Sequence, residues 1–375
     1  MNKTFDHIHF NLNTNVNNPL RIIFLCGSFF VFDGKEKDGR KDKRVVLRKY
    51  IEDLSPNFKC VILEDKFLFS NDTEKLNYND IDFKSLKIIE VLTSIMSDKV
   101  MVFHESFSTA AEIGLFSGNT NITNKMVILA PDLYSIEEDV ISGFLKLSYN
   151  NDYFKDFNIE ILRYYPGVYN YDISENFRKY HTYFVGNEIG ESLDKSLREQ
   201  LKFETELRVK LSRRTNYTKK NYYSLLENNL NIVMETNNLI AYLMSLFTVK
   251  SVKSEMRTKR DDIDSITDSV VIRRKILFKV SAILKEYFND YIVKSIRADN
   301  PSLEFEKYDI ILSGHEVTLS KTIDYFVYII FGIGLIKINE KKIVITTEME
   351  AISANYSNLI VKNASGILSE VLDFE

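Results

Sequence analysis

Short apolar runs that alternate with helical segments are the feature that most constrains the fold of this chain. Each run is apolar at successive positions, which is typical of strands buried on both faces. The runs occupy residues 21–27, 59–63, 99–103, 125–130 and 159–164. Helical periodicity lies between them, at 45–54, 82–97, 108–116 and 136–147. The pattern predicts an α/β domain in which helices flank a parallel sheet.

The crossovers of such a sheet are right-handed, so the segments that follow its strands gather along one edge, where ligands bind. Polar and small residues are concentrated in these segments. We therefore predict a binding site at this edge of the sheet. Its candidate residues are Cys26, Gly27, Ser28, Glu64, Asp65, His104, Glu105, Ser106, Ser108, Thr109 and Glu112.

The segment 104–117 is the most informative one. It leaves a strand, passes through small hydroxyl residues and enters a helix, with Glu112 in its first turns beside Ala110, Ala111 and Gly114. Free N–H groups at a helix start bind phosphate or hydroxyl groups. A carboxylate held against an anomeric carbon stabilises or attacks an oxocarbenium-like sugar. Glu112 is thus the candidate catalytic carboxylate, and the alternative is an ordinary acid that favours a first helical turn.

Other candidates have weaker signals. Glu64 and Asp65 follow the second strand, where they either bind sugar hydroxyls or act as solvated loop acids or a helix cap. Glu105 is a second candidate for a sugar hydroxyl, and two nearby carboxylates would raise one another's pKa. Gly27 permits close backbone approach to a ligand. His104 either donates to a phosphate or has a structural role.

Several reaction classes lack support in the sequence. There is no GxxxxGK[ST] loop, HExxH helix, CxxC pair or GxSxG elbow. Cys26 and Cys60 lie in apolar runs, and we interpret them as reduced core thiols of a cytosolic protein rather than as metal ligands. We expect neither a metal nor a cofactor. The net charge of −4 over 375 residues gives no global attraction to nucleic acid or to an anionic membrane, so any such contact requires a local patch.

The domain organisation can be predicted from changes in composition. We expect a loose arm at 1–20, the catalytic α/β domain at 21–190, a helical connection at 191–265, and a C-terminal domain at 266–375. Charged stretches at 33–44 and 257–264 are expected to be an exposed loop and a linker. A helix at 320–331, a hairpin at 334–347 that turns at 339–341, and a helix starting near Glu348 together suggest a winged-helix-like module. No apolar run is long enough to span a bilayer.

The chain resembles the nucleoside deoxyribosyltransferase-like effectors that accompany bacterial retrons in anti-phage defence. The family pattern has a strand that ends in Cys-Gly, a Glu-Asp pair after the next strand, and a strand that leads through Glu-Ser into a helix with Glu-(Leu/Ile)-Gly-x-Phe-Ser. Here these positions are Cys26-Gly27, Glu64-Asp65, Glu105-Ser106 and residues 112–117. The likeness covers residues 20–150, and the C-terminal region of the family is also winged-helix-like.

The resemblance implies a Rossmann-like catalytic domain and a toxic N-glycosidase that degrades a nucleotide pool, NAD or a related nucleotide. Glu112 matches the catalytic glutamate of the family. The implied partner is a retron reverse transcriptase with its RNA–DNA hybrid product, and a homodimer is expected by analogy. Typical deoxyribosyltransferases place an Asp six positions before this glutamate, where the chain has Ser106. The difference argues against base exchange and favours hydrolysis or a different sugar.

Two alternatives remain open at this point. The first is a nucleotide-binding sensor that uses the same cleft without turnover. The second is a regulator that binds DNA or protein through the winged-helix-like module. The helix at 320–331 offers mainly Lys321 as a basic residue, which argues against reading of a DNA groove by this helix.

Overall fold

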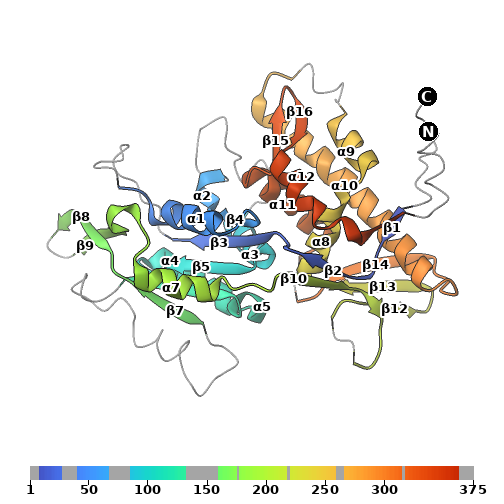
Figure 1. Cartoon of the computed structure of the whole chain (residues 1–375), viewed down its shortest axis with the longest axis horizontal. Helices are drawn as coiled ribbons and strands as arrows, with labels where there is room; N and C mark the ends of the chain where they lie inside the picture. The colour runs from blue at the N-terminus through green and yellow to red at the C-terminus, as the bar shows by residue number, and fades with distance from the viewer. Residues whose placement is uncertain are drawn as a thin grey trace. The chain divides into compact units, whose positions relative to one another are not determined.

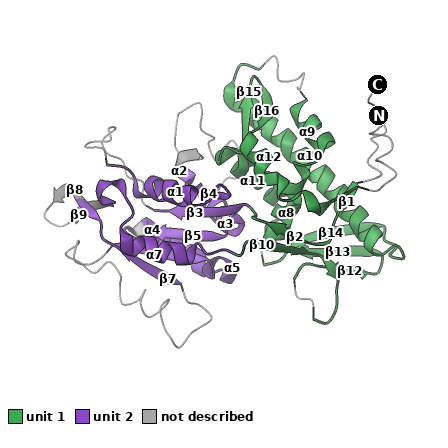
Figure 2. Ribbon diagram, viewed as in Figure 1, with its two compact units in different colours: residues 1–19, 79–82, 204–375 green, residues 20–78, 83–203 purple. Residues whose placement is uncertain are grey.

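A computed structural model describes residues 8–27, 40–66, 85–131, 159–174, 177–217, 220–258, 266–314 and 317–362. The chain divides into two compact units (Figure 2). Unit 2 comprises residues 20–78 and 83–203, and contains the predicted α/β domain. Unit 1 comprises residues 1–19, 79–82 and 204–375.

Unit 2 is built around a five-stranded parallel sheet (Figure 1). All five predicted strands are present, which confirms the α/β class. They are β3 (Arg21–Cys26), β4 (Phe58–Val61), β5 (Lys99–Phe103), β6 (Met126–Pro131) and β7 (Glu160–Tyr164). A two-stranded antiparallel ribbon, β8 (Gly167–Ser174) and β9 (Phe177–Tyr183), follows the sheet.

The strand order of the sheet is β4-β3-β5-β6-β7. Strand β4 therefore lies on one side of β3, and β5, β6 and β7 are added in sequence on the other side. The order reverses between β3 and β5, which pair in register with Ile23 opposite Lys99 and Cys26 opposite Val102. In open parallel sheets of this kind, ligands bind beyond the carboxyl ends of the strands at this reversal.

Helices cover both faces of the sheet. Helices α1 (Lys43–Leu54) and α7 (Glu191–Gln200) pack on one face, where their apolar side chains share a core with alternate residues of the strands. Helices α3 (Leu86–Met96) and α4 (Phe107–Ser117) cover the other face, where Phe116 of α4 meets Phe24 of β3 edge-on at 6.3 Å. The short helix α5 (Thr120–Thr123) follows α4.

The predicted helices at 45–54, 82–97 and 108–116 correspond to α1, α3 and α4. The prediction of an exposed loop over residues 33–44 was wrong at its end. Lys43 and Arg44 are the first two residues of α1 and are buried, at 3% and 1% exposure. The helix starts there because the side chain of Asp42 accepts a hydrogen bond from Arg44 N and caps it. Residues 33–39 and the predicted helix at 136–147 lie outside the described residues.

Unit 1 combines small sheets with helices. The largest sheet has four strands, β11 (Ser212–Arg213), β12 (Tyr222–Leu226), β13 (Asn229–Met234) and β14 (Lys307–Leu312). Its helices are α8 (Thr236–Leu246), α9 (Lys250–Arg257), α10 (Ser269–Asp299), α11 (Leu319–Gly332) and α12 (Thr347–Ala354). The long helix α10 packs against α8, α9 and α11 (Figure 1).

The prediction of a loose arm over residues 1–20 was wrong for much of that stretch. Strand β1 (Ile8–Phe10) pairs with β17 (Ile360–Lys362), and β2 (Asn13–Asn17) pairs with β10 (Glu206–Lys210). Apolar residues alternate with asparagines here, so Phe10, Leu12 and Val16 are buried. The high Asn content concealed this two-residue period.

The helical interpretation of residues 191–255 was also wrong in its middle part. Strands β10 to β13 occupy most of residues 206–234. In β13 the buried residues are Leu230, Ile232 and Met234, which alternate with half-exposed ones. Such alternation indicates a strand. The frequent Leu and Tyr residues of this region also fit a helical spacing, and the sequence was therefore interpreted as helical.

The C-terminal helix, hairpin and helix are confirmed as α11, β15 (Ile336–Asn339), β16 (Lys342–Ile345) and α12. Asn339 pairs with Lys342, so the turn has two residues. These are Glu340 and Lys341, with φ of 45° and 62°. Two positive φ values mark a type I′ turn, whose twist suits a tight hairpin. In the part of the chain described here, no helix is long and apolar enough to cross a membrane.

Candidate functional site

The predicted site residues of β3 and β5 lie on the two sides of the reversal in strand order. Gly27 follows β3 directly, and His104 and Glu105 follow β5. A Cβ atom at Gly27 would lie 3.2 Å from Arg44 Cδ and 3.2 Å from Phe103 Cβ, so a larger residue would have to displace its neighbours. This position is therefore closely packed by the start of α1 and the end of β5.

Arg44 is the buried centre of this edge of the sheet. Its Nη1 donates to the carbonyl oxygen of Gly27 at 2.9 Å and to Glu64 Oε1 at 2.9 Å, while its Nη2 donates to Asp42 Oδ2 at 2.9 Å. Burial alone would lower the pKa of Arg44, but Asp42 and Glu64 more than offset this and raise it. The guanidinium is therefore a permanent positive charge that joins the ends of β3 and β4 to the start of α1.

Glu112 lies on α4, one and a half turns into the helix. The side chain is half-buried, and its Oε2 atom is buried without a hydrogen-bond partner among the described residues. Burial, together with the charges of Glu90 and Glu64, raises the pKa of Glu112 to about 8, against the opposing effect of Arg44. A buried polar oxygen that lacks a partner is rare in folded proteins, so this one marks Glu112 as a candidate for function.

Glu90 on α3 is a third carboxylate of this site, and its pKa is raised to about 7 by burial and by Glu64. Burial and then the charges of Glu112, Glu90 and Glu64 raise the pKa of the Cys26 thiol, while Arg44 lowers it. The three carboxylates and the one guanidinium therefore surround the end of β3. When these carboxyl groups are ionised, such an environment stabilises positive charge that develops on a ligand.

Glu105 belongs to a separate network of buried side chains. Its carboxylate accepts hydrogen bonds from Lys43, Tyr164 and Thr182, and the Lys43 and Glu105 side chains are each 3% exposed. The Tyr164 and Thr182 hydroxyls also contact each other at 2.9 Å. The Lys43 ammonium lies 5.4 Å from the centre of the Phe103 ring. In this arrangement the carboxylate of Glu105 is fully occupied by protein donors.

The hydroxyl residues at the start of α4 form its cap. Ser106 Oγ accepts from Thr109 N at 3.3 Å, and Thr109 Oγ1 accepts from Ser106 N at 3.1 Å, which is a reciprocal capping box. Ser106 Oγ also contacts Ser108 Oγ at 2.8 Å, and Ser108 is exposed whereas Thr109 is buried. The cap fixes the direction in which α4 presents Glu112.

The remaining predicted residues are placed as follows. Cys26 is a buried free thiol. His104 is half-buried, and its backbone N–H donates to Leu129 O at 2.9 Å. Asp65 lies in the short helix α2 (Leu63–Lys66), but its side chain is outside the description, as is the whole of Ser28. Among the described residues, no group of three or more His, Cys, Asp or Glu side chains is arranged to hold a metal ion.

Sequence reasoning did not identify Lys43, Arg44, Glu90, Tyr164 or Thr182. A signal for the first two was present, because Asp42 directly precedes a helical period and so predicts a helix start at residue 43. No local pattern predicts the others, since their role depends on the pairing of distant segments.

One consequence of the raised pKa of Glu112 concerns stability. A carboxyl group whose pKa rises from 4.5 to about 8 on folding binds its proton more tightly in the folded state. Unfolding between pH 4.5 and about pH 8 therefore releases a proton. As a result, the free energy of unfolding falls as the pH rises through this window. We expect Glu112→Gln to be more stable than the unchanged chain by ~1–3 kcal/mol at pH 8, after allowance for solvent screening, and by little below about pH 5. Thermal unfolding measured across this range checks the prediction.

The matched control is Glu199→Gln, which removes an exposed carboxylate from α7. It is expected to follow the curve of the unchanged chain. A constant difference between Glu112→Gln and the unchanged chain at every pH would contradict the assigned direction of the shift.

A family model described as STM3845 retron effector protein matches residues 40–285, about two thirds of the chain. A comparison with curated proteins finds no match. The matched region includes Arg44, Glu64, Glu90, Glu105 and Glu112, and thus both buried networks at the edge of the sheet. The chain belongs to the STM3845 retron effector protein family.

Proposed function

We propose that the chain is a toxic effector in retron-type anti-phage defence, and that it hydrolyses the N-glycosidic bond of a nucleotide, NAD or a related one. Membership of a retron effector family supports the defence role. The observation that carries the proposed reaction is Glu112, a half-buried carboxyl group with an unused oxygen at the reversal in strand order. Such a position is where nucleotides bind in sheets of this kind.

Cleavage of an N-glycosidic bond develops positive charge on the sugar ring. An ionised Glu112 would stabilise or attack the anomeric carbon of that sugar, and the nearby charges of Glu64 and Glu90 would add to the stabilisation. The approach of a cationic transition state lowers the pKa of Glu112, because an opposite charge favours the ionised form. The carboxyl group then releases its proton to solvent, which leaves the carboxylate that the reaction needs.

Arg44 would act as a positioning residue in this site. It holds Glu64 and the carbonyl of Gly27 in fixed places, and it limits the rise in the pKa of Glu112. The network of Lys43, Glu105, Tyr164 and Thr182 would fix the segment that follows β5. A direct contact of Glu105 with a sugar hydroxyl, as the sequence suggested, would require this network to open. The other proposed contacts of the substrate are Cys26, Gly27, Ser28, Glu64, Asp65, His104, Ser106, Ser108 and Thr109.

The wider assembly is proposed on the resemblance. A retron reverse transcriptase with its RNA–DNA hybrid product would hold the effector inactive, and a homodimer is the proposed oligomeric state. The C-terminal helix, hairpin and helix are proposed as a winged-helix-like module that serves assembly. Nine of the fourteen residues of α11 are buried, which leaves little of this helix to read a DNA groove.

Incubation of the purified chain with NAD, deoxynucleoside monophosphates and nucleosides tests the proposal directly. Chromatography should show a free base and the matching sugar product from at least one of them. Free base without transfer to an added acceptor base would identify hydrolysis. Thermal stabilisation by a nucleotide without any product would instead support the nucleotide-binding sensor.

A further inference from the structure

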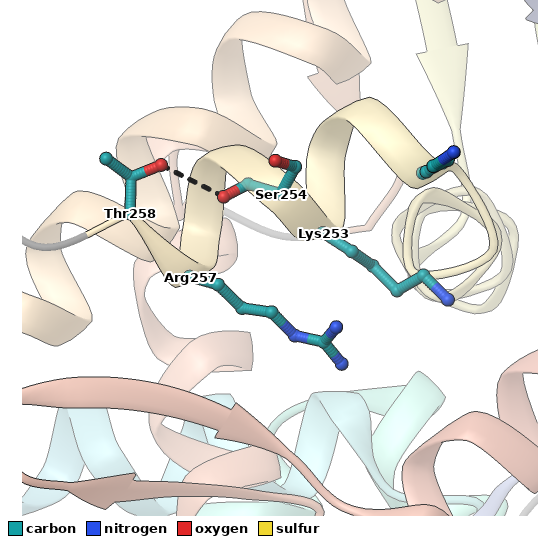
Figure 3. A pocket seen from close by; sticks show the side chains of 5 residues that line it. Lys253, Ser254, Arg257 and Thr258 are labelled. Atoms are coloured by element: carbon teal, nitrogen blue, oxygen red, sulfur yellow. Dashed lines mark hydrogen bonds between the residues drawn. The ribbon is translucent and has the colours of Figure 1, made fainter. Parts of the chain in front are cut away.

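Unit 1 carries a basic hollow on the surface of α9. Its volume is about 470 Å³, and its lining residues are Lys250, Lys253, Ser254, Arg257 and Thr258 (Figure 3). Among the residues that the structure describes, the lining therefore presents ammonium, guanidinium and hydroxyl groups, and no acidic or aromatic side chain. Only the aliphatic stems of the basic residues add apolar surface.

The fold fixes this face of the helix outward. Residues 250, 253 and 257 follow the spacing i, i+3, i+7 and so lie on one side of α9. Figure 3 shows Lys253 and Arg257 extending from the helix in the same direction. The opposite side is anchored, since Val252 and Met256 are buried and Glu255 accepts a hydrogen bond from Tyr287 of α10 at 3.0 Å.

The positive charge of the hollow is only partly balanced. Glu350 of α12 lies 3.3 Å from Arg257 and 3.9 Å from Lys253, and its side chain is 45% exposed. Lys250 has no ion-pair partner within the described residues, and the first turn of α9 contains no acid. Lys279 of α10 adds a further cation, which donates to Thr258 O at 2.6 Å. In a chain of net charge −4, this is a local concentration of opposite sign.

The lining chemistry indicates the class of ligand. Ammonium, guanidinium and hydroxyl groups bind phosphate oxygens. Recognition of bases by stacking needs aromatic side chains, and the described part of the lining contains none. The three cations lie between the first and the last residue of α9, seven helical steps apart, or roughly 10 Å along the helix axis. A row of this length matches several consecutive phosphates better than one.

We infer that the hollow on α9 binds the phosphate groups of a nucleotide or polynucleotide ligand through Lys250, Lys253 and Arg257, and that Glu350 is a built-in competitor for these cations. The site is independent of the proposed N-glycosidase activity. It recognises backbone charge rather than sequence, and it supplies the local patch that the negative chain as a whole lacks.

Fluorescence anisotropy with labelled single-stranded DNA of about 20 nucleotides and mixed sequence tests the inference on the full chain. The double variant Lys253→Gln/Arg257→Gln is expected to bind this probe at least roughly tenfold more weakly near 50 mM salt, and the slope of log K against log salt should fall by about 1–2. The matched control, Lys202→Gln/Lys220→Gln, removes two exposed cations elsewhere and should bind as the unchanged chain does.

Glu350→Gln provides a test in the opposite direction. It removes the competing carboxylate and is expected to tighten binding of the same probe about threefold or more. Labelled ATP in place of the oligonucleotide distinguishes a small ligand from a polynucleotide. Binding of ATP but not of the oligonucleotide, weakened in the double variant, identifies the hollow as a nucleotide site. The inference is wrong if the double variant binds both probes as tightly as the unchanged chain, or if the unchanged chain binds neither.

Discussion

Replacement of Glu112 by Gln is expected to reduce base release by roughly 10³–10⁶-fold while the fold is retained. The amide has nearly the same shape but can neither carry the negative charge that stabilises the sugar cation nor attack the anomeric carbon. The side chain of Glu112 is half-buried and makes no hydrogen bond through Oε2 among the described residues, so the substitution breaks no hydrogen bond of that oxygen. Chromatographic assay of base release, with thermal unfolding as the check on folding, measures both effects.

Glu90→Gln is the matched control because it removes the neighbouring carboxyl group by the same isosteric change. It is expected to keep activity within roughly tenfold of the unchanged chain. The charge of Glu90 is the second largest cause of the raised pKa of Glu112, so its removal should lower that pKa. Activity should rise with pH as Glu112 ionises near pH 8, and this rise should move to lower pH in the control.

Two results would contradict the role of Glu112. The first is Glu112→Gln that folds and releases base at the rate of the unchanged chain. The second is a rate of base release that falls as pH rises through about 8, in the unchanged chain and in every variant. This profile belongs to a protonated acid rather than to a carboxylate. In the second case, the retained proton would make Glu112 a donor to the leaving base.

The sheet of unit 2 could be predicted because its strands carry an unmistakable local signal. Each of β3, β5 and β6 is buried along nearly all its length, so its sequence is continuously apolar. The strands of unit 1 are buried on one face only. Their alternating pattern is easily mistaken when asparagines occupy the exposed positions, as in β2, or when leucines do, as at Leu225 and Leu226 of β12.

The candidate site could be predicted only for residues whose place in the fold follows from their own segment of sequence. Glu112 follows a strand and a capping box within ten residues, so topology alone places it at the ligand-binding edge. Arg44 and Glu90 come from helices on opposite faces of the sheet. Their meeting with Glu64 and Glu112 depends on the strand order β4-β3-β5, which a single sequence does not disclose. Charge interactions of this kind require the assembled fold.

Lys43→Met is expected to lower the free energy of unfolding by ~3–5 kcal/mol. The substitution leaves the carboxylate of Glu105 buried without its counter-charge, since both side chains are 3% exposed. Removal of one partner from a buried ion pair is costly because the remaining charge stays desolvated. Urea denaturation of the unchanged chain and the variant at neutral pH measures this difference.

The double variant Lys43→Met/Glu105→Met is the decisive comparison. It removes both charges and keeps similar side-chain volumes, so most of the lost stability should return. The Tyr164 and Thr182 hydroxyls keep their mutual contact of 2.9 Å, in which one donates to the other. A single variant that loses less than about 1 kcal/mol would show that the pair is not desolvated as described.

The same double variant separates the two roles considered for Glu105. If the carboxylate only fixes the segment after β5, a stable double variant should release base at close to the rate of the unchanged chain. If it instead binds a sugar hydroxyl, the buried hydrogen bond to substrate is lost, and kcat/KM should fall by about 10-fold or more although stability has returned. The network of Lys43, Tyr164 and Thr182 that surrounds Glu105 favours the first result, because every oxygen of the carboxylate already has a donor in the protein.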